Sequence, residues 1–266
     1  FPRSPSFSRI ALEIWHAFGY NREKTTRRWA MRDCETEIRE RVAFIKKLLA
    51  EAHADGVIYG NSGGKDSALV MILCKMACEN TESVIIPCSS KRNFTIDKDD
   101  GMAVSDKFNI KTRVLDITPQ KELAMEALGA ITELNQQAIT NLAPRLRMLS
   151  LYAIGASENR LVAGTGNASE YHMGYFTKWG DGACDFNPIS DLTATEVFEF
   201  LEYLKAPRCI IDKAPSAGLY EGQTDEEIRA ILEKKVKEQF ENEVQAVEEK
   251  IARLKVKAET LKNFMK

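Results

Sequence analysis

The stretch Gly60-Asn61-Ser62-Gly63-Gly64-Lys65-Asp66-Ser67 lies between two apolar runs. The preceding run, residues 56–59 (Gly-Val-Ile-Tyr), favours a strand, and the run that starts at Ala68 favours a helix continuing to about Asn80. A glycine-rich turn between a strand and a helix directs backbone N–H groups and the helix dipole at one point, where they stabilise a phosphate. The stretch therefore predicts a nucleotide-binding α/β protein.

The spacing of this loop excludes a Walker loop. Only three residues separate Gly60 from Gly64, one fewer than in the Walker pattern, and Asp66 stands where that pattern has a magnesium-binding hydroxyl. The pattern Ser-Gly-Gly-x-Asp-Ser of residues 62–67 instead resembles the pyrophosphate loop of ATP pyrophosphatases, which cleave ATP between its α and β phosphates. The alternative, a glycine-rich turn that binds no ligand, is less consistent with so many matched positions in a strand–turn–helix context.

The composition agrees with a soluble enzyme. Charged residues make up 29% of the 266 residues and the formal net charge is −2, so no general field attracts nucleic acid or an anionic membrane. No apolar run reaches the roughly 18 residues that a membrane span needs. The six cysteines have no zinc-site spacing; Cys74 and Cys78, four apart in the predicted helix, are expected to be free thiols. We therefore expect a reducing, cytoplasmic location.

The chain is expected to have three parts. Residues 1–31 form a basic extension, either disordered or upstream of a natural start at Met31, although their composition also fits a transit peptide. Residues 32–226 form the ATP pyrophosphatase domain. Residues 227–266 form a long amphipathic C-terminal helix with a heptad-like seam, which either packs on its own domain or contacts a second subunit.

Residues 32–226 read as alternating helices and strands. A helix is predicted at Glu35–Ala54, and strands are predicted at Val57–Tyr59, Ser83–Pro87, Thr112–Ile117 and Leu161–Ala163. This alternation predicts a parallel sheet flanked by helices on both faces. Ligands of such sheets bind at the carboxyl ends of the strands. The segment Gly164-Thr165-Gly166-Asn167 is therefore expected to share a site with the pyrophosphate loop.

The second half of the chain closely resembles ammonia-dependent NAD synthetase. The matching blocks are residues 144–148, 164–170, 174–185, 187–193, 213–219 and 221–226. The resemblance implies a Rossmann-like fold of the adenine nucleotide alpha-hydrolase type. It also implies that ATP activates the carboxylate of deamido-NAD as an acyl adenylate, and that ammonia then releases AMP and NAD. Mg²⁺ is the implied cofactor, and a homodimer is the implied assembly.

The resemblance also implies roles for individual residues. Asp66 and Glu170 match metal ligands, and Asp66 and Lys213 match catalytic positions. Deamido-NAD would contact Arg145, Lys178 and Asp185. ATP would contact Gly60, Asn61, Ser62, Gly63, Gly64, Lys65, Asp66, Ser67, Thr165 and Lys213. Alternatively, Asp66 could be a helix N-terminal charge and Glu170 part of a solvated face, and the other charges could be surface ion pairs. No catalytic role is expected for His16, His53 or His172.

The chain departs from the family pattern at two places, both in segments that the family uses to enclose its substrates. The family's segment with an ATP-contacting hydroxyl residue does not follow Glu226, and its C-terminal His-Lys pair is absent. The length leaves no room for an amidase domain, so free ammonia is the expected nitrogen donor. Two other hypotheses stay open: another adenylating amidotransferase or tRNA-modifying pyrophosphatase, and a nucleotide-binding homologue without turnover.

Overall fold

The computed structural model describes residues 32–213. The chain divides into two units between Glu40 and Arg41, inside helix α2 (Cys34–Ala52), and we describe the two sides separately. In residues 32–40, the backbone N–H of Thr36 donates to the Asp33 carboxylate at 3.2 Å, which satisfies one of the free N–H groups at the helix start. The predictions made for residues 1–31 and 227–266, and both departures after Glu226, lie outside the described residues.

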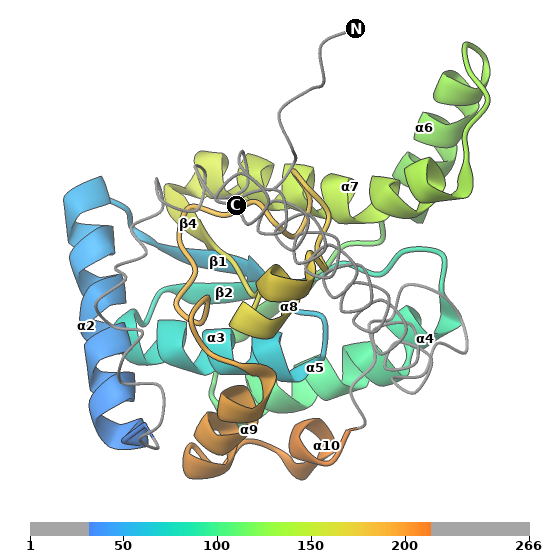
Figure 1. The fold of residues 1–266 in the computed structure, drawn as a ribbon. Coiled ribbons are helices and arrows are strands. Elements are labelled where there is room, and N and C mark those ends of the chain that lie inside the picture. Colours follow the sequence, from blue (N-terminus) through green and yellow to red (C-terminus); the bar gives the residue numbers. More distant parts are fainter. Residues whose placement is uncertain (1–31, 214–266) are drawn as a thin grey trace, which may run out of the picture. The chain divides into compact units, whose positions relative to one another are not determined.

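From Arg41 onward, the fold is built on a parallel sheet with the strand order β3-β2-β1-β4 (Figure 1). The strands are β1 (Gly56–Gly60), β2 (Thr81–Ile85), β3 (Lys111–Val114) and β4 (Arg160–Ala163). Each strand was predicted, but both bounds of β2 were wrong by two residues, and β3 begins one residue earlier and ends three residues earlier than predicted. Beyond β3, the backbone N–H groups of Leu115 and Ile117 still bond to residues 85 and 87, so the extended chain continues after the regular ladder ends.

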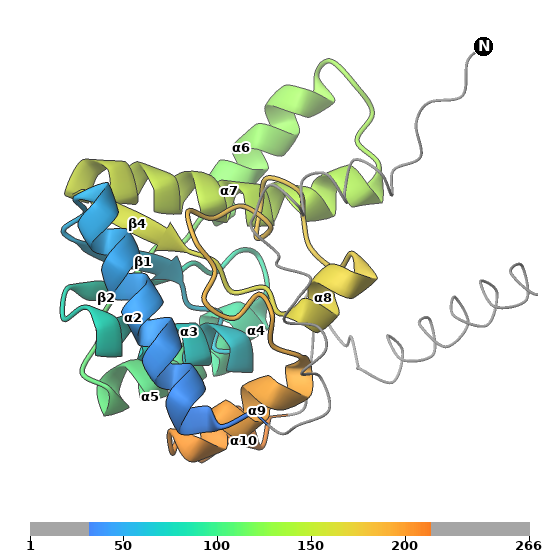
Figure 2. The ribbon, with the colours of Figure 1, turned by 60° about the vertical axis from the view of Figure 1, so that its left-hand side comes forward.

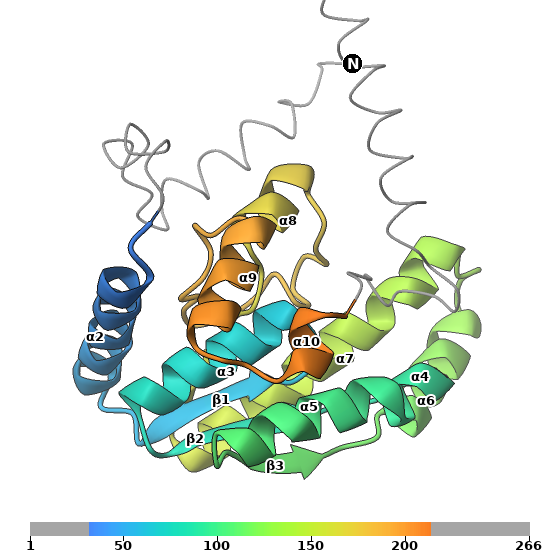
Figure 3. The same cartoon turned by 90° about the horizontal axis from the view of Figure 1, so that it is seen from below.

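Helices cover both faces of the sheet (Figures 1 and 3). On one face α7 (Gln136–Glu158) packs on β1 and β4, with α6 (Thr118–Gly129) against it. On the other face lie α3 (Lys65–Ala77) and α5 (Ile96–Lys107), and α9 (Ala194–Tyr203) and α10 (Arg208–Ile211) pack outside α3. The expected parallel α/β architecture is confirmed.

The burial of the strands and of α3 explains this layering. Every residue of β2, and every residue of β1 except Gly60, is buried, as expected for parallel strands covered on both faces. Ile58, Val84 and Val162 from three neighbouring strands form one core with Leu151 of α7. Helix α3 is buried continuously from residue 67 to residue 74 because it lies between the sheet and α9.

The carboxyl ends of the strands carry two short helices, α4 (Lys91–Phe94) and α8 (Ala168–Met173). Figure 2 shows the arrowheads of β1 and β4 directed toward α8. Within residues 32–213, no helix is both long enough and apolar enough to cross a membrane. Cys74 and Cys78 are free, as predicted, and so are the other four cysteines; Cys74 is buried and Cys78 is partly buried.

Candidate functional site

The connection from β1 to α3 is ordered by its own side chains. The backbone N–H of Gly63 donates to the Asn61 side chain at 3.1 Å, and that of Gly64 donates to the Ser62 hydroxyl at 3.3 Å. The Asn61 amide in turn donates to the carbonyl of Gly101 in α5 at 3.1 Å. Protein side chains therefore fix the shape of the loop, and its N–H groups gather at the start of α3.

Gly63 is the conformationally demanding position of this loop. Its φ is +68°, in the left-handed region that favours glycine. A Cβ atom at this position would lie 2.1 Å from the backbone carbonyl oxygen of Asp97. The loop and the start of α5 thus approach more closely than any side chain at residue 63 would allow.

Asp66 joins the two loops that the sequence predicted to share a site. It lies in the first turn of α3, where its carboxylate accepts from the Lys65 ammonium at 2.6 Å. The side-chain amide of Asn167, in the connection after β4, donates to Asp66 at 3.0 Å. Thr165 lies in the same connection. The prediction that these loops meet is confirmed.

Glu170 provides a second carboxylate beside Asp66. It completes a capping box at the start of α8, in which Asn167 is the N-cap residue. Burial raises the pKa of Glu170 to about 7, and the charge of Asp66 adds to the effect. Two carboxylates that repel each other in a partly buried place are a favourable position for a cation.

The donor set fits a hard divalent cation whose remaining ligands come from outside the protein. Among residues 32–213, no group of three or more His, Cys, Asp or Glu side chains could hold a metal ion. Mg²⁺ commonly binds through one or two carboxylates, with waters and substrate phosphates completing its shell. Asp66 and Glu170 match that pattern.

Lys213 lies against the pyrophosphate loop from the far end of the described chain. Its ammonium donates to the Gly63 carbonyl at 3.1 Å, to Asp97 at 2.9 Å and to Asp100 at 2.7 Å. Its side chain is 17% exposed. The structure therefore brings Lys213 to the predicted ATP site.

The residues expected to contact deamido-NAD are brought together in part. Arg145 of α7 donates to the backbone carbonyl of Lys178 at 3.3 Å, and the Lys178 ammonium lies 5.4 Å from the exposed ring of Trp179. Asp185 is held elsewhere, accepting from the backbone N–H of Val162 in β4 at 2.7 Å. Arg145 and Lys178 thus form an exposed cationic cluster, whereas Asp185 is tied to the sheet.

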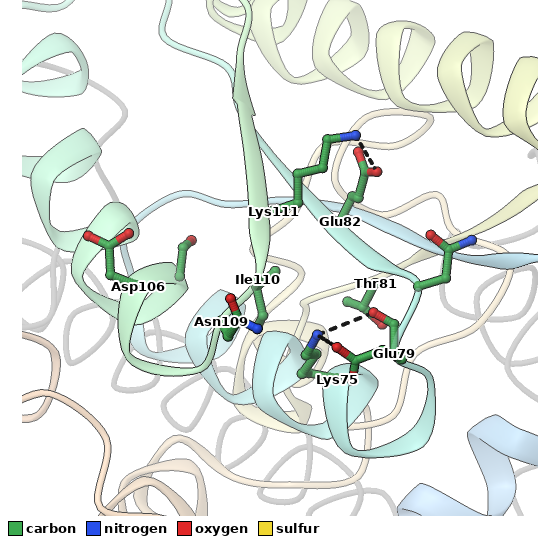
Figure 4. A pocket seen from close by; sticks show the side chains of 10 residues that line it. Lys75, Glu79, Thr81, Glu82, Asp106, Asn109, Ile110 and Lys111 are labelled. Atoms are coloured by element: carbon green, nitrogen blue, oxygen red, sulfur yellow. Dashed lines mark hydrogen bonds and ion pairs between the residues drawn. The ribbon is translucent and has the colours of Figure 1, made fainter.

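Two hollows in the surface differ in their relation to this site. One of about 470 Å³ lies at the amino ends of β2 and β3 (Figure 4), whereas the pyrophosphate loop follows the carboxyl end of β1. Both lysines in its lining are already paired, Lys75 with Glu79 and Lys111 with Glu82, so we assign it no ligand. The other, of about 460 Å³, lies between the chain after β2 and Asp116, at the edge where parallel sheets bind ligands.

The family model for NAD synthase matches residues 37–266, which include the pyrophosphate loop, the β4 connection and Lys213. The chain belongs to the NAD synthase family. The predicted resemblance to ammonia-dependent NAD synthetases is confirmed.

Several NAD synthases and related enzymes resemble the chain over most of its length. It is 44% identical over 195 residues to the NH(3)-dependent NAD(+) synthetase of Carboxydothermus hydrogenoformans, covering 72% of this chain and 79% of that one. The structure of NMN synthetase from Francisella tularensis is 35% identical with a TM-score of 0.67, covering 74% and 81%. The NH3-dependent NAD synthetase of Campylobacter jejuni is 30% identical with a TM-score of 0.63, covering 78% and 86%.

Sequence reasoning assigned no individual role to three polar residues of this site. Asn167 was part of a matched block, but its contact with Asp66 depends on β4 lying beside β1. Asp97 and Asp100 lie in α5, more than a hundred residues from their partner Lys213. The only local signal for them was a run of acidic residues near the start of a helix. Such residues are commonly exposed to solvent and stabilise the helix dipole, so the run did not indicate a site.

The raised pKa of Glu170 predicts how the stability of this NAD synthase depends on pH. A carboxyl group whose pKa rises from 4.5 to about 7 on folding destabilises the folded state progressively as the pH rises between those values. Without divalent metal, Glu170→Gln should therefore increase the free energy of unfolding by up to about 3 kcal/mol more at pH 8 than at pH 5. Urea denaturation of both proteins at the two pH values measures this difference.

A matched control is Glu133→Gln, because Glu133 is exposed. Its effect on the free energy of unfolding should be nearly the same at pH 5 and pH 8. Equal effects of Glu170→Gln on the free energy of unfolding at the two pH values would contradict a raised pKa of Glu170.

Proposed function

We propose that the chain forms NAD from deamido-NAD, ATP and ammonia. The observation that carries the proposal is the hydrogen bond from Asn167 to Asp66, which joins a pyrophosphate loop to the connection after β4. The nicotinate carboxylate attacks the α-phosphorus of ATP, and pyrophosphate leaves. Ammonia then attacks the acyl carbon of the adenylate, AMP leaves, and loss of a proton gives the amide of NAD.

The loop at residues 60–67 would bind the ATP phosphates. The N–H groups of Gly63 and Gly64 donate to the side chains of Asn61 and Ser62. When ATP binds, phosphate oxygens would replace these side chains as the acceptors of the two N–H groups. Lys213 would add a positive charge where negative charge develops on the leaving pyrophosphate. Thr165 would contact ATP from the neighbouring connection.

Asp66 and Glu170 would hold Mg²⁺ beside the phosphates. When bound, the cation would neutralise charge on the leaving pyrophosphate. The support is the raised pKa of Glu170, which burial causes in the first place and the charge of Asp66 increases; a cation between the two carboxylates would relieve both effects. Lys65 already pairs with Asp66, so it contributes to this charge balance from the protein side.

Arg145 and Lys178 would bind the anionic groups of deamido-NAD. The planar guanidinium of Arg145 suits a phosphate or a carboxylate, and its contact with the Lys178 backbone fixes both residues at one place. We assign Asp185 a supporting role in deamido-NAD binding from its separate position beside β4. Its bond to the backbone of β4 holds the chain that follows Cys184 in position.

The enzyme is proposed to be a cytoplasmic homodimer that does not act on nucleic acid. Leu123, Ile131 and Leu149 expose 70%, 81% and 67% of their surface around α6 and α7, which favours a protein contact there. The free cysteines fit a reducing compartment, and the net charge of −2 does not favour nucleic acid. Light scattering coupled to chromatography should give twice the mass of one chain; a monomer would contradict the dimer.

Incubation of the purified full chain with ATP, Mg²⁺, deamido-NAD and ammonium tests the function. We expect NAD and AMP in equal amounts, and no NAD when glutamine replaces ammonium. A parallel reaction with nicotinic acid mononucleotide is needed because one similar structure is an NMN synthetase. Faster amidation of the mononucleotide would overturn deamido-NAD as the substrate.

Two further outcomes would favour the other hypotheses. Binding of ATP without release of AMP would indicate a nucleotide-binding homologue without turnover. Release of AMP only when a different acceptor, such as tRNA, is added would indicate another adenylating enzyme of the pyrophosphate-loop type.

A further inference from the structure

The ammonium of Lys213 has all of its donors engaged by protein acceptors. A lysine ammonium carries three N–H donors. In this site they bond to the Gly63 carbonyl and to the carboxylates of Asp97 and Asp100. If Lys213 is to bind an ATP phosphate, it must give up one of these three acceptors.

The two carboxylates differ in how well they tolerate the loss of Lys213. Asp97 also accepts from the Arg92 guanidinium at 3.3 Å and from the Asn93 amide at 3.0 Å, so its charge stays compensated. Asp100 has the Cys209 thiol as its other side-chain partner in the described chain, and a thiol is a weak donor. Both carboxylates are largely buried, with exposed fractions of 14% and 15%.

Leaving a buried carboxylate without a strong donor is costly, so the bond to Asp100 is the one that Lys213 retains. The Gly63 carbonyl belongs to the loop itself, and its bond keeps the ammonium over the phosphate site. Asp97 remains as the acceptor that can be replaced.

We propose that Asp97 is the exchangeable partner of Lys213 and Asp100 its fixed anchor. This proposal rests on the proposed role of Lys213 in ATP binding. When ATP enters, one of its phosphate oxygens replaces the Asp97 carboxylate as an acceptor of the Lys213 ammonium. Asp97 then remains paired with Arg92 and Asn93, while Asp100 keeps the ammonium in place. Both aspartates are positioning residues. Asp97 competes with ATP for the Lys213 ammonium, and Asp100 holds that ammonium near the phosphates.

The test compares three isosteric variants of α5 in the full chain, Asp97→Asn, Asp100→Asn and Asp99→Asn. Asp99 is exposed and is not one of the three acceptors of Lys213, so its variant measures the general effect of removing one negative charge. Calorimetry with ATP and Mg²⁺, without deamido-NAD, gives the Kd for ATP. Turnover with all substrates gives kcat, and thermal unfolding reports on the fold.

Relative to Asp99→Asn, we expect Asp97→Asn to lower the Kd for ATP by up to about tenfold, because the competing acceptor is weakened. We expect Asp100→Asn to raise the Kd and to lower kcat by about tenfold or more, because the lysine loses its anchor. Opposite changes in Kd for two residues on one helix would not follow from a general loss of structure.

A double-mutant comparison keeps the test decisive if Asp100→Asn does not fold. In a Lys213→Met background, Asp97→Asn should change the Kd for ATP no more than Asp99→Asn does, because no ammonium is left to compete for. Equal changes in Kd for Asp97→Asn and Asp99→Asn in the native background, or weaker ATP binding by Asp97→Asn, would overturn the proposal. NAD formation by the unmodified protein tests the proposed function separately, whichever result is obtained.

Discussion

Asp66→Ala should reduce formation of AMP and NAD by at least about a thousandfold, because the substitution removes a proposed ligand of Mg²⁺ from the phosphate site. It also leaves the Lys65 ammonium without its carboxylate partner and removes the acceptor of Asn167. Single-turnover measurement of AMP, at saturating ATP and across a range of Mg²⁺ concentrations, separates loss of chemistry from loss of binding.

The variant Asp66→Asn serves as the companion to this experiment. An asparagine keeps the shape and can still accept from the Asn167 amide, so the contact between the two loops should survive while the charge is lost. We expect both variants to fold and to lose AMP formation, and Asp66→Asn to unfold at the higher temperature of the two because it keeps an acceptor for Lys65 and Asn167. Turnover of either variant within about tenfold of the unmodified protein would refute the metal role of Asp66.

Gly63→Ala should weaken ATP binding by about a hundredfold or more, because an alanine is doubly unfavourable there. The positive φ is disfavoured for any residue with a Cβ atom, and that atom would lie 2.1 Å from the carbonyl oxygen of Asp97. Either the loop or the start of α5 must move, and both carry the contacts of Lys213. Calorimetric titration with ATP measures the loss directly.

Gly129→Ala is the matched control for Gly63→Ala. A Cβ atom at Gly129, the last residue of α6, would meet nothing within 4 Å. This variant should leave the Kd for ATP unchanged, and it should slightly stabilise the helix because alanine is the better helix former. ATP binding by Gly63→Ala within about threefold of the unmodified protein would show that the loop tolerates another conformation.

Much of the fold and of the phosphate site could be predicted from the sequence because their signals are local. The strands at residues 57–59 and 161–163 stand out as β-prone apolar runs, and the loop at 60–67 carries its glycines and its acidic residue within eight positions. The rule that parallel strands present their carboxyl ends at one edge then predicted that the segment 164–167 lies near the loop that carries Asp66. The roles of Thr165 and Glu170 were implied by the resemblance to NAD synthetases.

The remaining part of the site could not be predicted because it depends on the tertiary arrangement. Lys213 finds Asp97 and Asp100 only because α10, which precedes Lys213, packs near α3 and brings the chain back toward the loop. The end of β3 was also misjudged for a physical reason. Leu115 and Ile117 have strand-like composition and keep backbone bonds, but the regular ladder stops at Val114.

The bond between Asn167 and Asp66 has a consequence for folding. It spans 101 residues of sequence, and it can form only after the fourth strand in the sequence has paired with the first. Closing so long a segment is slow compared with forming local helices. The chain loses conformational entropy on closure before the new contact can stabilise the closed state. Recovery of nucleotide affinity during refolding should therefore lag behind recovery of helical signal, and would report the moment at which the sheet is completed.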